Sequence, residues 1–168
     1  MAKTLVKTLI FTLLAPGTVT VAVPYWLLGS GPAPGGGLRL LGWLPIALGA
    51  AFYCWCAWEF AAAGRGTPAP VDPPKVLVAR GLYRVVRNPM YVGVLLVLSG
   101  ESLVFGSWAL LRYAVLVWLC FHLFVVLYEE PALRRNFGAS YEDYCQRVRR
   151  WTPWLPPRGR TDRNGESI

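Results

Sequence analysis

Charged residues are scarce in this chain of 168 residues, where they make up 15% of the sequence, against about 25% in an average soluble domain. Hydrophobic residues make up 55%, and the mean hydropathy is +0.40. So apolar a chain excludes an intrinsically disordered protein, and its length argues against a soluble enzyme of two domains. Because the apolar residues also come in long uncharged blocks, the composition predicts a single integral membrane domain over residues 1–168.

Metal ligands are equally few. The chain has one histidine, His122, and four cysteines, and no two cysteines form a C-x-x-C pair. A structural zinc site needs four ligands at defined spacing, which this set does not supply. We therefore predict no metal site. We interpret the cysteines as reduced packing residues: Cys54, Cys56, Cys120 and Cys145.

Acidic residues number nine against 17 lysines and arginines, which gives a net charge of +8. The positions of the basic residues decide what this excess means. In the topology predicted below, all of them except Arg39 and Arg112 fall on one side of the membrane, which is the positive-inside bias of membrane proteins. This asymmetry argues against a nucleic-acid partner. The basic segment 75–87 is expected to meet the anionic headgroups of membrane lipids.

The uncharged blocks predict an all-α, polytopic membrane protein of about four transmembrane helices. A helix needs roughly 20 apolar residues to span the hydrocarbon layer, and segments rich in glycine and proline separate the candidates. Four spans place both termini on one side, which is the cytoplasmic side by the positive-inside rule. Size and composition favour a bacterial inner membrane. The predicted spans are 8–28, 38–60, 89–105 and 108–128, with a tight hairpin at Gly106-Ser107 between the last two.

The chain beyond residue 128 is soluble in character and predicts a cytoplasmic helical segment. The last span is expected to continue as a helix to about Gly138, with a kink at Pro131, which has no N–H group. A second short helix follows, for which Ser140 is a plausible N-cap. Residues 153–168 are rich in proline, arginine and glycine and predict a flexible tail.

The hairpin brings two motifs to the same membrane face. The third helix starts and the fourth ends on the cytoplasmic side, so residues 88–91 must lie near Glu129 and Glu130. Adjacent residues on a helix diverge by about 100°, so one glutamate can face a pocket while the other meets the surface. Negative charge is unfavourable at the C-terminal end of a helix. A bound cation or an arginine would offset this cost, and the alternative is a solvated cap paired to Arg134 or Arg135.

Two further ionisable residues lie within the apolar segments. His122 precedes Glu129 by seven residues and shares nearly the same helical face. An ionisable residue inside a membrane suggests a function, although a neutral histidine bonded to a neighbouring helix is the commoner arrangement. Glu101 lies near the outer hairpin and is interpreted as solvated there. The tryptophans near the span ends, Trp151 among them, fit the aromatic belts at membrane interfaces.

Three motifs carry a family resemblance. Residues 75–93 read KVLVARGLYRVVRNPMYVG, residues 129–130 read EE, and residues 137–144 read FGASYEDY. Their order and spacing resemble the isoprenylcysteine carboxyl methyltransferase family and its phospholipid N-methyltransferase relatives. The pattern of that family is G-x-Y-x-x-x-R-H-P-x-Y-x-G, an apolar hairpin, E-E and F-G-x-x-Y-x-x-Y. The resemblance covers about residues 75–151, which would form a methyltransferase-like core.

This resemblance implies S-adenosyl-L-methionine as the methyl donor. In the family, the hairpin and the C-terminal helices form a cofactor pocket that opens to the cytoplasm, and a tunnel admits a lipophilic acceptor from the bilayer. The resemblance implies that residues 75–78 contact the cofactor through their backbone and that Tyr83 lines its pocket. Residues 88–91 would form the turn at the start of the third helix, and Glu129, with Glu130 beside it, would bind the polar groups of the cofactor. The cofactor-binding residues so implied are Lys75, Val76, Leu77, Val78, Tyr83, Asn88, Pro89, Met90, Tyr91, Glu129 and Glu130.

Two positions depart from the family pattern. Asn88 stands where the family usually has histidine; asparagine can donate and accept hydrogen bonds but cannot become cationic. Val125 stands where an arginine is expected in the eukaryotic prenylcysteine enzymes. A carboxylate acceptor is already a nucleophile at neutral pH and needs a cation to hold it. Arg87 is the first candidate for this catalytic role, and Arg84 is the second.

The acceptor class stays open at the level of the sequence. A prenylcysteine-like carboxylate, a phospholipid amine and a small hydrophobic thiol all fit a membrane methyltransferase. A related membrane reductase that uses a nicotinamide cofactor is a second hypothesis, which the paired glutamates and the R-x-P-x-Y turn disfavour. A third hypothesis is a non-catalytic protein whose basic face binds anionic lipid, in which case Glu129 would be freely replaceable.

Overall fold

The computed structural model describes residues 10, 12, 14–29, 39–62, 77 and 79–153. This described part contains helices and turns and no strand, which confirms the all-α prediction for it. Three of the implied cofactor residues, Lys75, Val76 and Val78, lie outside the described residues, as do residues 154–168 of the predicted tail.

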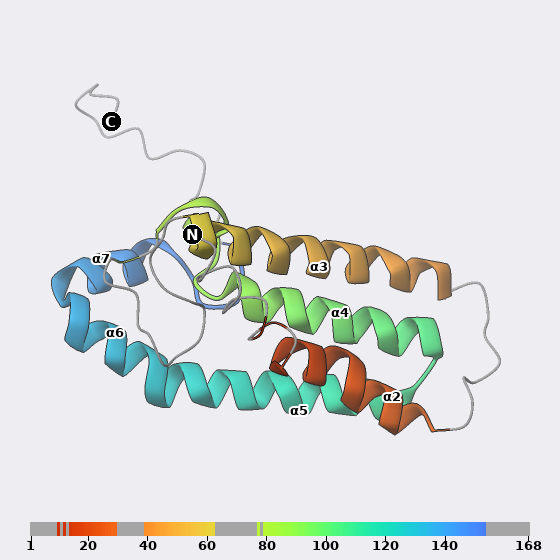
Figure 1. The fold of residues 1–168 in the computed structure, drawn as a ribbon. Helices are drawn as coiled ribbons and strands as arrows, with labels where there is room; N and C mark the ends of the chain where they lie inside the picture. Colours follow the sequence, from red (N-terminus) through yellow and green to blue (C-terminus); the bar gives the residue numbers. More distant parts are fainter. Residues whose placement is uncertain are drawn as a thin grey trace, which may run out of the picture.

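Three long helices lie side by side along the molecule, and two short ones gather at one end (Figure 1). The hairpin of α4 and α5 is flanked by α3, which packs against α4, and by α2, which packs against α5. The elements in chain order are η1 (Thr18–Ala22), α2 (Val23–Leu28), α3 (Arg39–Ala62), η2 (Gly81–Arg84), α4 (Pro89–Phe105), α5 (Trp108–Phe124), η3 (Val125–Glu129), α6 (Glu130–Phe137) and α7 (Ala139–Arg147).

Glycines bring the backbones of α3 and α4 together. Gly42 and Gly49 on α3 face Gly100 and Gly93 on α4, and each pair is spaced by seven residues along its helix. A Cβ on Gly42 would lie 2.7 Å from the carbonyl oxygen of Gly100, and one on Gly93 would lie 2.8 Å from that of Gly49. Only a residue without a side chain permits this approach, which is typical of helix pairs in membranes.

The hairpin between α4 and α5 agrees with the sequence prediction. Gly106 ends α4 in the left-handed conformation with φ at 58°, which glycine adopts without strain. The hydroxyl of Ser107 accepts a hydrogen bond from the backbone N–H of Leu110 at 3.4 Å and caps α5. Buried side chains then hold the two helices together: Val94, Leu98, Ala114 and Val117.

The long second arm of the hairpin runs without a break from Trp108 to Phe137. The expected disturbance at Pro131 takes the form of a π-helical turn, Val125–Glu129, directly before that proline. A proline ring crowds the carbonyl group four residues earlier, here that of Leu127. The wider π turn lies at this point, and such turns accommodate a proline within an otherwise continuous helix.

The C-terminal helices form a second small core. Tyr141 and Tyr144 on α7 pack with Val148 and with Leu133 of α6. The prediction that Ser140 caps α7 is wrong, because the helix starts at Ala139 after Gly138 and has no side-chain cap. Gly138 has φ at 50°, which lets the chain turn sharply between α6 and α7.

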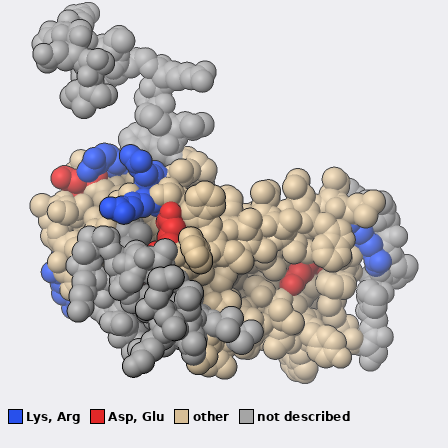
Figure 2. All heavy atoms as spheres, turned by 45° about the horizontal axis from the view of Figure 1, so that its top comes forward, with Lys and Arg blue, Asp and Glu red and all other residues tan. Residues whose placement is uncertain are grey.

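Two helices are long and apolar enough to cross a membrane. They are Arg39–Glu59 and Trp108–Phe137, and only 17% and 22% of their most apolar windows are buried inside the protein. The remainder faces outward, with large exposed side chains such as Trp43, Trp55 and Trp118. On the face drawn in Figure 2, charged side chains gather mainly over the end that holds α6 and α7, and uncharged residues cover most of the rest. This distribution suits a membrane protein with one polar end.

Candidate active site

The two motifs expected to meet do lie together. The phenol of Tyr91, in the first turn of α4, donates a hydrogen bond to Oε2 of Glu129 at 3.1 Å. Nη1 of Arg87 lies 3.3 Å from Oε1 of Glu130. Both glutamates follow the apolar stretch 108–128, so the site forms where the hairpin leaves its apolar part.

Glu130 is held by three arginines. Arg150 donates two hydrogen bonds to its carboxylate, at 2.6 and 3.0 Å, Arg87 lies at 3.3 Å, and Arg134 lies at 3.6 Å. Glu130 is only 3% exposed. Burial alone would raise its pKa, but the hydrogen bonds from Arg150 and the positive charges of the three arginines lower the pKa below the ordinary value of a glutamate. Glu130 is therefore an anionic structural centre of the site.

Glu129 has a different environment. Its one hydrogen bond among the described residues comes from Tyr91, and it forms no ion pair with a lysine or arginine of that part of the chain. Burial raises its pKa, the hydrogen bond from Tyr91 opposes this, and the neighbouring charge of Glu130 adds to the rise. A partly desolvated carboxylate with no cation beside it in the described part of the chain is the group of this site that gains most from a positively charged ligand.

Two cavities meet at these residues. The larger has a volume of about 540 Å³, within the range of small-molecule sites. It is lined mainly by apolar and aromatic side chains of α4 and α5, with Tyr53 from α3 and residues 15, 16 and 19 from the N-terminal segment. The smaller has a volume of about 70 Å³ and extends between α6 and α7. Four residues line both: Tyr83, Arg87, Asn88 and Glu129.

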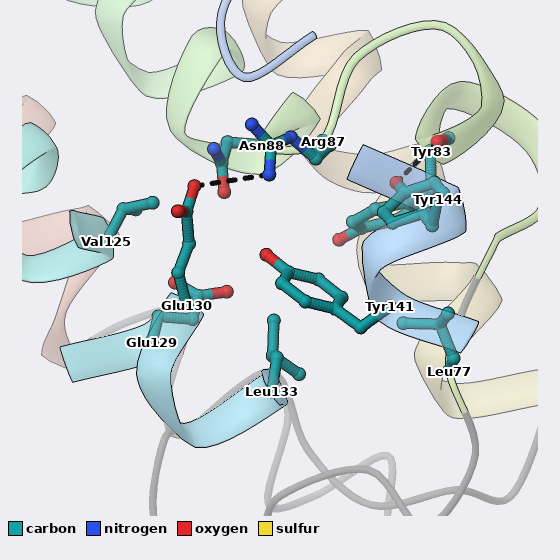
Figure 3. A pocket seen from close by; sticks show the side chains of 10 residues that line it. All are labelled: Leu77, Tyr83, Arg87, Asn88, Val125, Glu129, Glu130, Leu133, Tyr141 and Tyr144. Atoms are coloured by element: carbon teal, nitrogen blue, oxygen red, sulfur yellow. Dashed lines mark hydrogen bonds and ion pairs between the residues drawn. The ribbon is translucent and has the colours of Figure 1, made fainter. Parts of the chain in front are cut away.

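Figure 3 shows how the smaller cavity is built. The carboxylate of Glu130 rises toward Arg87 and Asn88, and Tyr141 points into the space from the opposite side. Tyr144 lies beside Tyr83, whose backbone carbonyl accepts a hydrogen bond from the Tyr144 phenol at 2.6 Å. The cavity thus combines acidic and basic groups with aromatic rings.

The turn that precedes α4 is fixed by its own hydrogen bonds. Asn88 is 7% exposed, and its Nδ2 donates to the backbone carbonyl of Arg150 at 3.1 Å. Pro89 is buried but lines neither cavity, whereas Met90 and Tyr91 line the larger one. At Leu77 the chain reaches the smaller cavity. Asn88, at the position where the family usually has histidine, therefore stabilises the turn before α4 and also lines both cavities.

The structure separates the two predicted catalytic arginines. Arg87 is half-buried and lines both cavities, but its Nη1 also contacts Glu130 and donates to Sγ of Cys145 at 2.7 Å. Arg84, in η2, is exposed and lines neither cavity. Val125, at the other departure from the family pattern, is buried and lines the smaller cavity without adding a charge.

His122 is bonded as the commoner interpretation expects, although to the C-terminal segment rather than to another spanning helix. The indole N–H of Trp151 donates to Nδ1 of His122 at 3.1 Å. Trp151, which was expected in an interfacial belt, packs beside the rings of His122 and Tyr91. Glu101 is only partly exposed, and its Oε2 is buried without a hydrogen-bond partner among the described residues.

Several residues of the site were not assigned a role from the sequence. Tyr141 and Tyr144 belong to the F-G-x-x-Y-x-x-Y motif, and their spacing of three on a helix was the signal that both could face one cavity. Phe121 packs against Tyr91 at a ring distance of 4.6 Å, but nothing distinguishes it from other apolar residues of α5. Arg150 gave no signal, because its contact with Glu130 depends on the return of the chain after α7.

Comparisons with known proteins agree with this arrangement. The sequence profile of the family described as "Phospholipid methyltransferase" matches residues 38–140. Protein-S-isoprenylcysteine O-methyltransferase B of Arabidopsis thaliana is 34% identical over 80 residues, which cover 47% of this chain and 40% of that protein. The Protein-S-isoprenylcysteine O-methyltransferase of Schizosaccharomyces pombe is 33% identical over 82 residues, 48% of this chain and 34% of that protein.

A relative named for another activity has a similar identity. Methanethiol S-methyltransferase 2 of Bradyrhizobium diazoefficiens is 35% identical over 81 residues, which cover 48% of this chain and 30% of that protein. The matched part of the chain thus spans at most about 40% of the length of these relatives. No solved structure matches the chain significantly. Since the family profile covers well over half of the sequence, the chain belongs to the phospholipid methyltransferase family.

Proposed function

We propose that this protein transfers a methyl group from S-adenosyl-L-methionine to a lipophilic acceptor at the membrane. The observation that carries the proposal is the position of Glu129. This carboxylate is half-buried, has no cationic partner in the described part of the chain, and lies where a large apolar cavity meets a small polar one. The family membership and the names of the matched relatives support the same activity.

The residues present fit the proposed cofactor. S-adenosyl-L-methionine would supply a methyl group on a positively charged sulfur, together with an amino acid moiety and an adenosine. Glu129 offers negative charge to its cationic groups, and the rings of Tyr83 and Tyr91 offer aromatic faces. Asn88 offers amide polar atoms, and Leu77 and Met90 offer apolar contacts.

Other residues would support the cofactor pocket less directly. Glu130 holds Arg87 and Arg150 in place, and Pro89 fixes the backbone at the start of α4. For Lys75, Val76 and Val78, the proposed backbone contacts rest on the family resemblance alone. Methyl transfer is an in-line displacement that depends on alignment more than on acid–base groups, and a rigid pocket suits this need.

We propose a prenylcysteine-like carboxylate as the first acceptor class to test. Several matched relatives are named for isoprenylcysteine O-methylation, and Arg87 lines the larger cavity, where it could contact a carboxylate. The apolar walls of that cavity suit a hydrocarbon chain. A phospholipid amine and a small thiol remain alternatives, and the name of the Bradyrhizobium relative favours the thiol.

We further propose that the chain crosses the membrane four times, with both termini in the cytoplasm of a bacterial cell. The two helices that are long enough to span support part of this topology. The shorter apolar helices Thr18–Leu28 and Pro89–Phe105 would supply the other two crossings. The gathering of charge near α6 and α7 supports placing that end in the cytoplasm.

Calorimetric titration of the detergent-purified protein tests the cofactor. S-adenosyl-L-methionine and S-adenosyl-L-homocysteine should each bind at one site per chain with micromolar affinity, and NADPH should not bind. Binding of NADPH in place of both would contradict the methyltransferase proposal and favour the reductase. Binding of none of them to protein with a cooperative thermal transition would also contradict it.

A panel of acceptors then tests the substrate class. Methyl transfer from labelled S-adenosyl-L-methionine would be measured with N-acetyl-farnesylcysteine, phosphatidylethanolamine and an alkyl thiol in matched micelles. Preference for the farnesylcysteine carboxylate is expected. A lead by the amine or the thiol would reassign the acceptor without changing the cofactor.

A further inference from the structure

A short segment after α7 crosses the proposed active site. We call residues 148–151 the C-terminal strap. Its backbone is tied to the turn before α4: the carbonyl of Arg149 accepts from the backbone N–H of Arg87 at 2.9 Å, and the carbonyl of Arg150 accepts from Nδ2 of Asn88 at 3.1 Å. The strap therefore lies against two residues that line both cavities.

The strap is also fixed at its start. Val148 is 6% exposed and packs with Tyr141 and Tyr144 in the second core. The backbone N–H of Val148 donates to the carbonyl of Tyr144 at 3.0 Å. Because Val148 fixes the start of the strap against α7, the side chains of Arg150 and Trp151 enter the site from a defined position.

Two strap side chains reach the other half of the site. Arg150 binds Glu130 through two hydrogen bonds, the geometry in which an arginine restricts a carboxylate most strongly. Trp151 donates to Nδ1 of His122, and its ring centroid lies 6.5 Å from that of Tyr91. Tyr91 in turn donates to Glu129. Arg150 thus contacts Glu130, and Trp151 packs beside Tyr91, while neither strap side chain lines a cavity itself.

We propose that Arg150 and Trp151 are positioning residues of the cofactor site. Arg150 acts through Glu130, whose orientation sets that of Arg87. Trp151 acts through His122 and Tyr91, and so through the hydroxyl that directs Glu129. This inference rests on the proposed function, because it concerns the binding of S-adenosyl-L-methionine. It adds a role for two residues at the end of the methyltransferase-like core to which the sequence analysis assigned no function in the site.

A simple structural role predicts a different outcome. If the strap only held the fold together, its variants would unfold more easily, but the molecules that remained folded would bind the cofactor as before. If the strap positions ligands, the folded molecules would bind more weakly. Affinity per folded molecule therefore distinguishes the two.

The test uses two conservative variants of the full chain and one control. Trp151→Phe keeps an aromatic ring and removes the N–H donor. Arg150→Lys keeps the positive charge and removes the bidentate hydrogen bonding to Glu130. Thr152→Ala, at an exposed neighbouring position, serves as the control. Titration with S-adenosyl-L-methionine gives the binding-competent fraction from the stoichiometry and the affinity from the curve, and thermal unfolding is measured alongside.

We expect the Kd to rise about fivefold in Trp151→Phe and about tenfold in Arg150→Lys, since each loses one hydrogen bond that aligns the site. The control should keep the wild-type Kd. Unchanged Kd values in both variants, with wild-type protein that binds, would overturn the positioning role. If the wild-type protein itself fails to bind, the proposed function fails instead, so the two failures are distinguishable.

A double-mutant cycle tests the route through His122. Trp151→Phe and His122→Leu both break the same hydrogen bond, so the double variant should lose less affinity than the product of the two single losses. Losses that multiply independently would show that Trp151 acts by another path, and would overturn this part of the proposal.

Discussion

Neighbouring glutamates at the end of one helix have opposite environments in this protein. Glu130 is neutralised by three arginines, whereas Glu129 accepts a single hydrogen bond from Tyr91 in the described part of the chain. A π-helical turn, Val125–Glu129, ends at this pair and places the two side chains on different sides. This contrast predicts that replacing Glu129 affects cofactor binding, whereas replacing Glu130 affects stability.

Replacing Glu129 by glutamine should weaken cofactor binding and leave the fold intact. The amide keeps the shape and can still accept from Tyr91, but it loses the charge that a cationic ligand needs. Hydrogen bonds to charged groups contribute about 1.5–3 kcal/mol, so we expect the Kd for S-adenosyl-L-methionine to rise at least about tenfold. Titration calorimetry and thermal unfolding of the same sample would measure both effects. An unchanged Kd would remove Glu129 from the cofactor site.

The matched change Glu130→Gln should act on stability. It leaves Arg87 and Arg150 beside a neutral group, and removal of one partner from a buried ion pair costs about 3 kcal/mol. We expect a clear fall in the midpoint of thermal unfolding in detergent, larger than that of Glu129→Gln. The interpretation of Glu130 as a structural centre would be wrong if its variant unfolded like the wild type.

The pH dependence of cofactor affinity follows from the pKa of Glu129. Burial raises this pKa above the ordinary value, and only the ionised carboxylate attracts a cation. Affinity should therefore be full above the raised pKa and fall as the pH drops through it, starting at a higher pH than an ordinary glutamate would allow. Titrations at successively lower pH, starting from about pH 8, would show at which pH the affinity of the wild type begins to fall. A flat profile is expected for Glu129→Gln, and an identical fall in both would exclude Glu129 as its source.

Parts of the site could be predicted from the sequence and others could not. The juxtaposition of residues 88–91 with the glutamates followed from hairpin topology, because helix ends on one membrane face must meet. The arginine that binds Glu130 most closely, Arg150, was missed because its position depends on the path of the chain after α7. For the same reason, the hydrogen bond between Trp151 and His122 was not predicted.

Among the elements, the contact between α3 and α4 depends most on particular small residues. Gly49 and Gly93 leave no room for side chains between the two backbones. We expect Gly93→Val to destabilise the protein by about 1–3 kcal/mol, the usual range for overpacking. Ala50→Val is the matched control, since Ala50 is exposed on the neighbouring position of α3. Chemical or thermal unfolding in detergent would compare them, and equal stability of both variants would contradict the close packing.

Element boundaries followed well from the sequence where strong signals occur. Helix α4 spans Pro89–Phe105, the predicted range, because proline starts it and Gly106 ends it. The sequence was less informative at Ser140 and Pro131, because a serine can cap a helix or lie inside it, and a proline can kink a helix or be accommodated within it. Ser140 is a residue type favoured at N-caps but lies inside α7, because Gly138, with its positive φ, is the N-cap and the helix starts two residues earlier than expected. The kink expected at Pro131 appears as a π turn before it, a form that no residue pattern specified.

At the scale of the whole molecule, charge and apolar surface are separated. The helices α3 and α5 present large apolar side chains outward, and charged residues gather near α6 and α7 (Figure 2). In water such a surface would drive aggregation, whereas in a bilayer it faces lipid. By the positive-inside rule, the topology proposed above places the end that holds α6 and α7 in the cytoplasm.

Reporter fusions in a bacterial host test this orientation. A fluorescent protein that folds only in the cytoplasm should be active when fused after the C-terminus, and alkaline phosphatase should be inactive there. Phosphatase inserted at the turn between Gly106 and Ser107 should be active, because four crossings place this turn on the opposite side. The two sites control for each other, since the proposed topology places them on opposite sides of the membrane. Phosphatase activity at the C-terminus would invert the topology, and it would also place Glu129 and the proposed cofactor site on the side of the membrane that lacks S-adenosyl-L-methionine, so the methyltransferase proposal would fail with it.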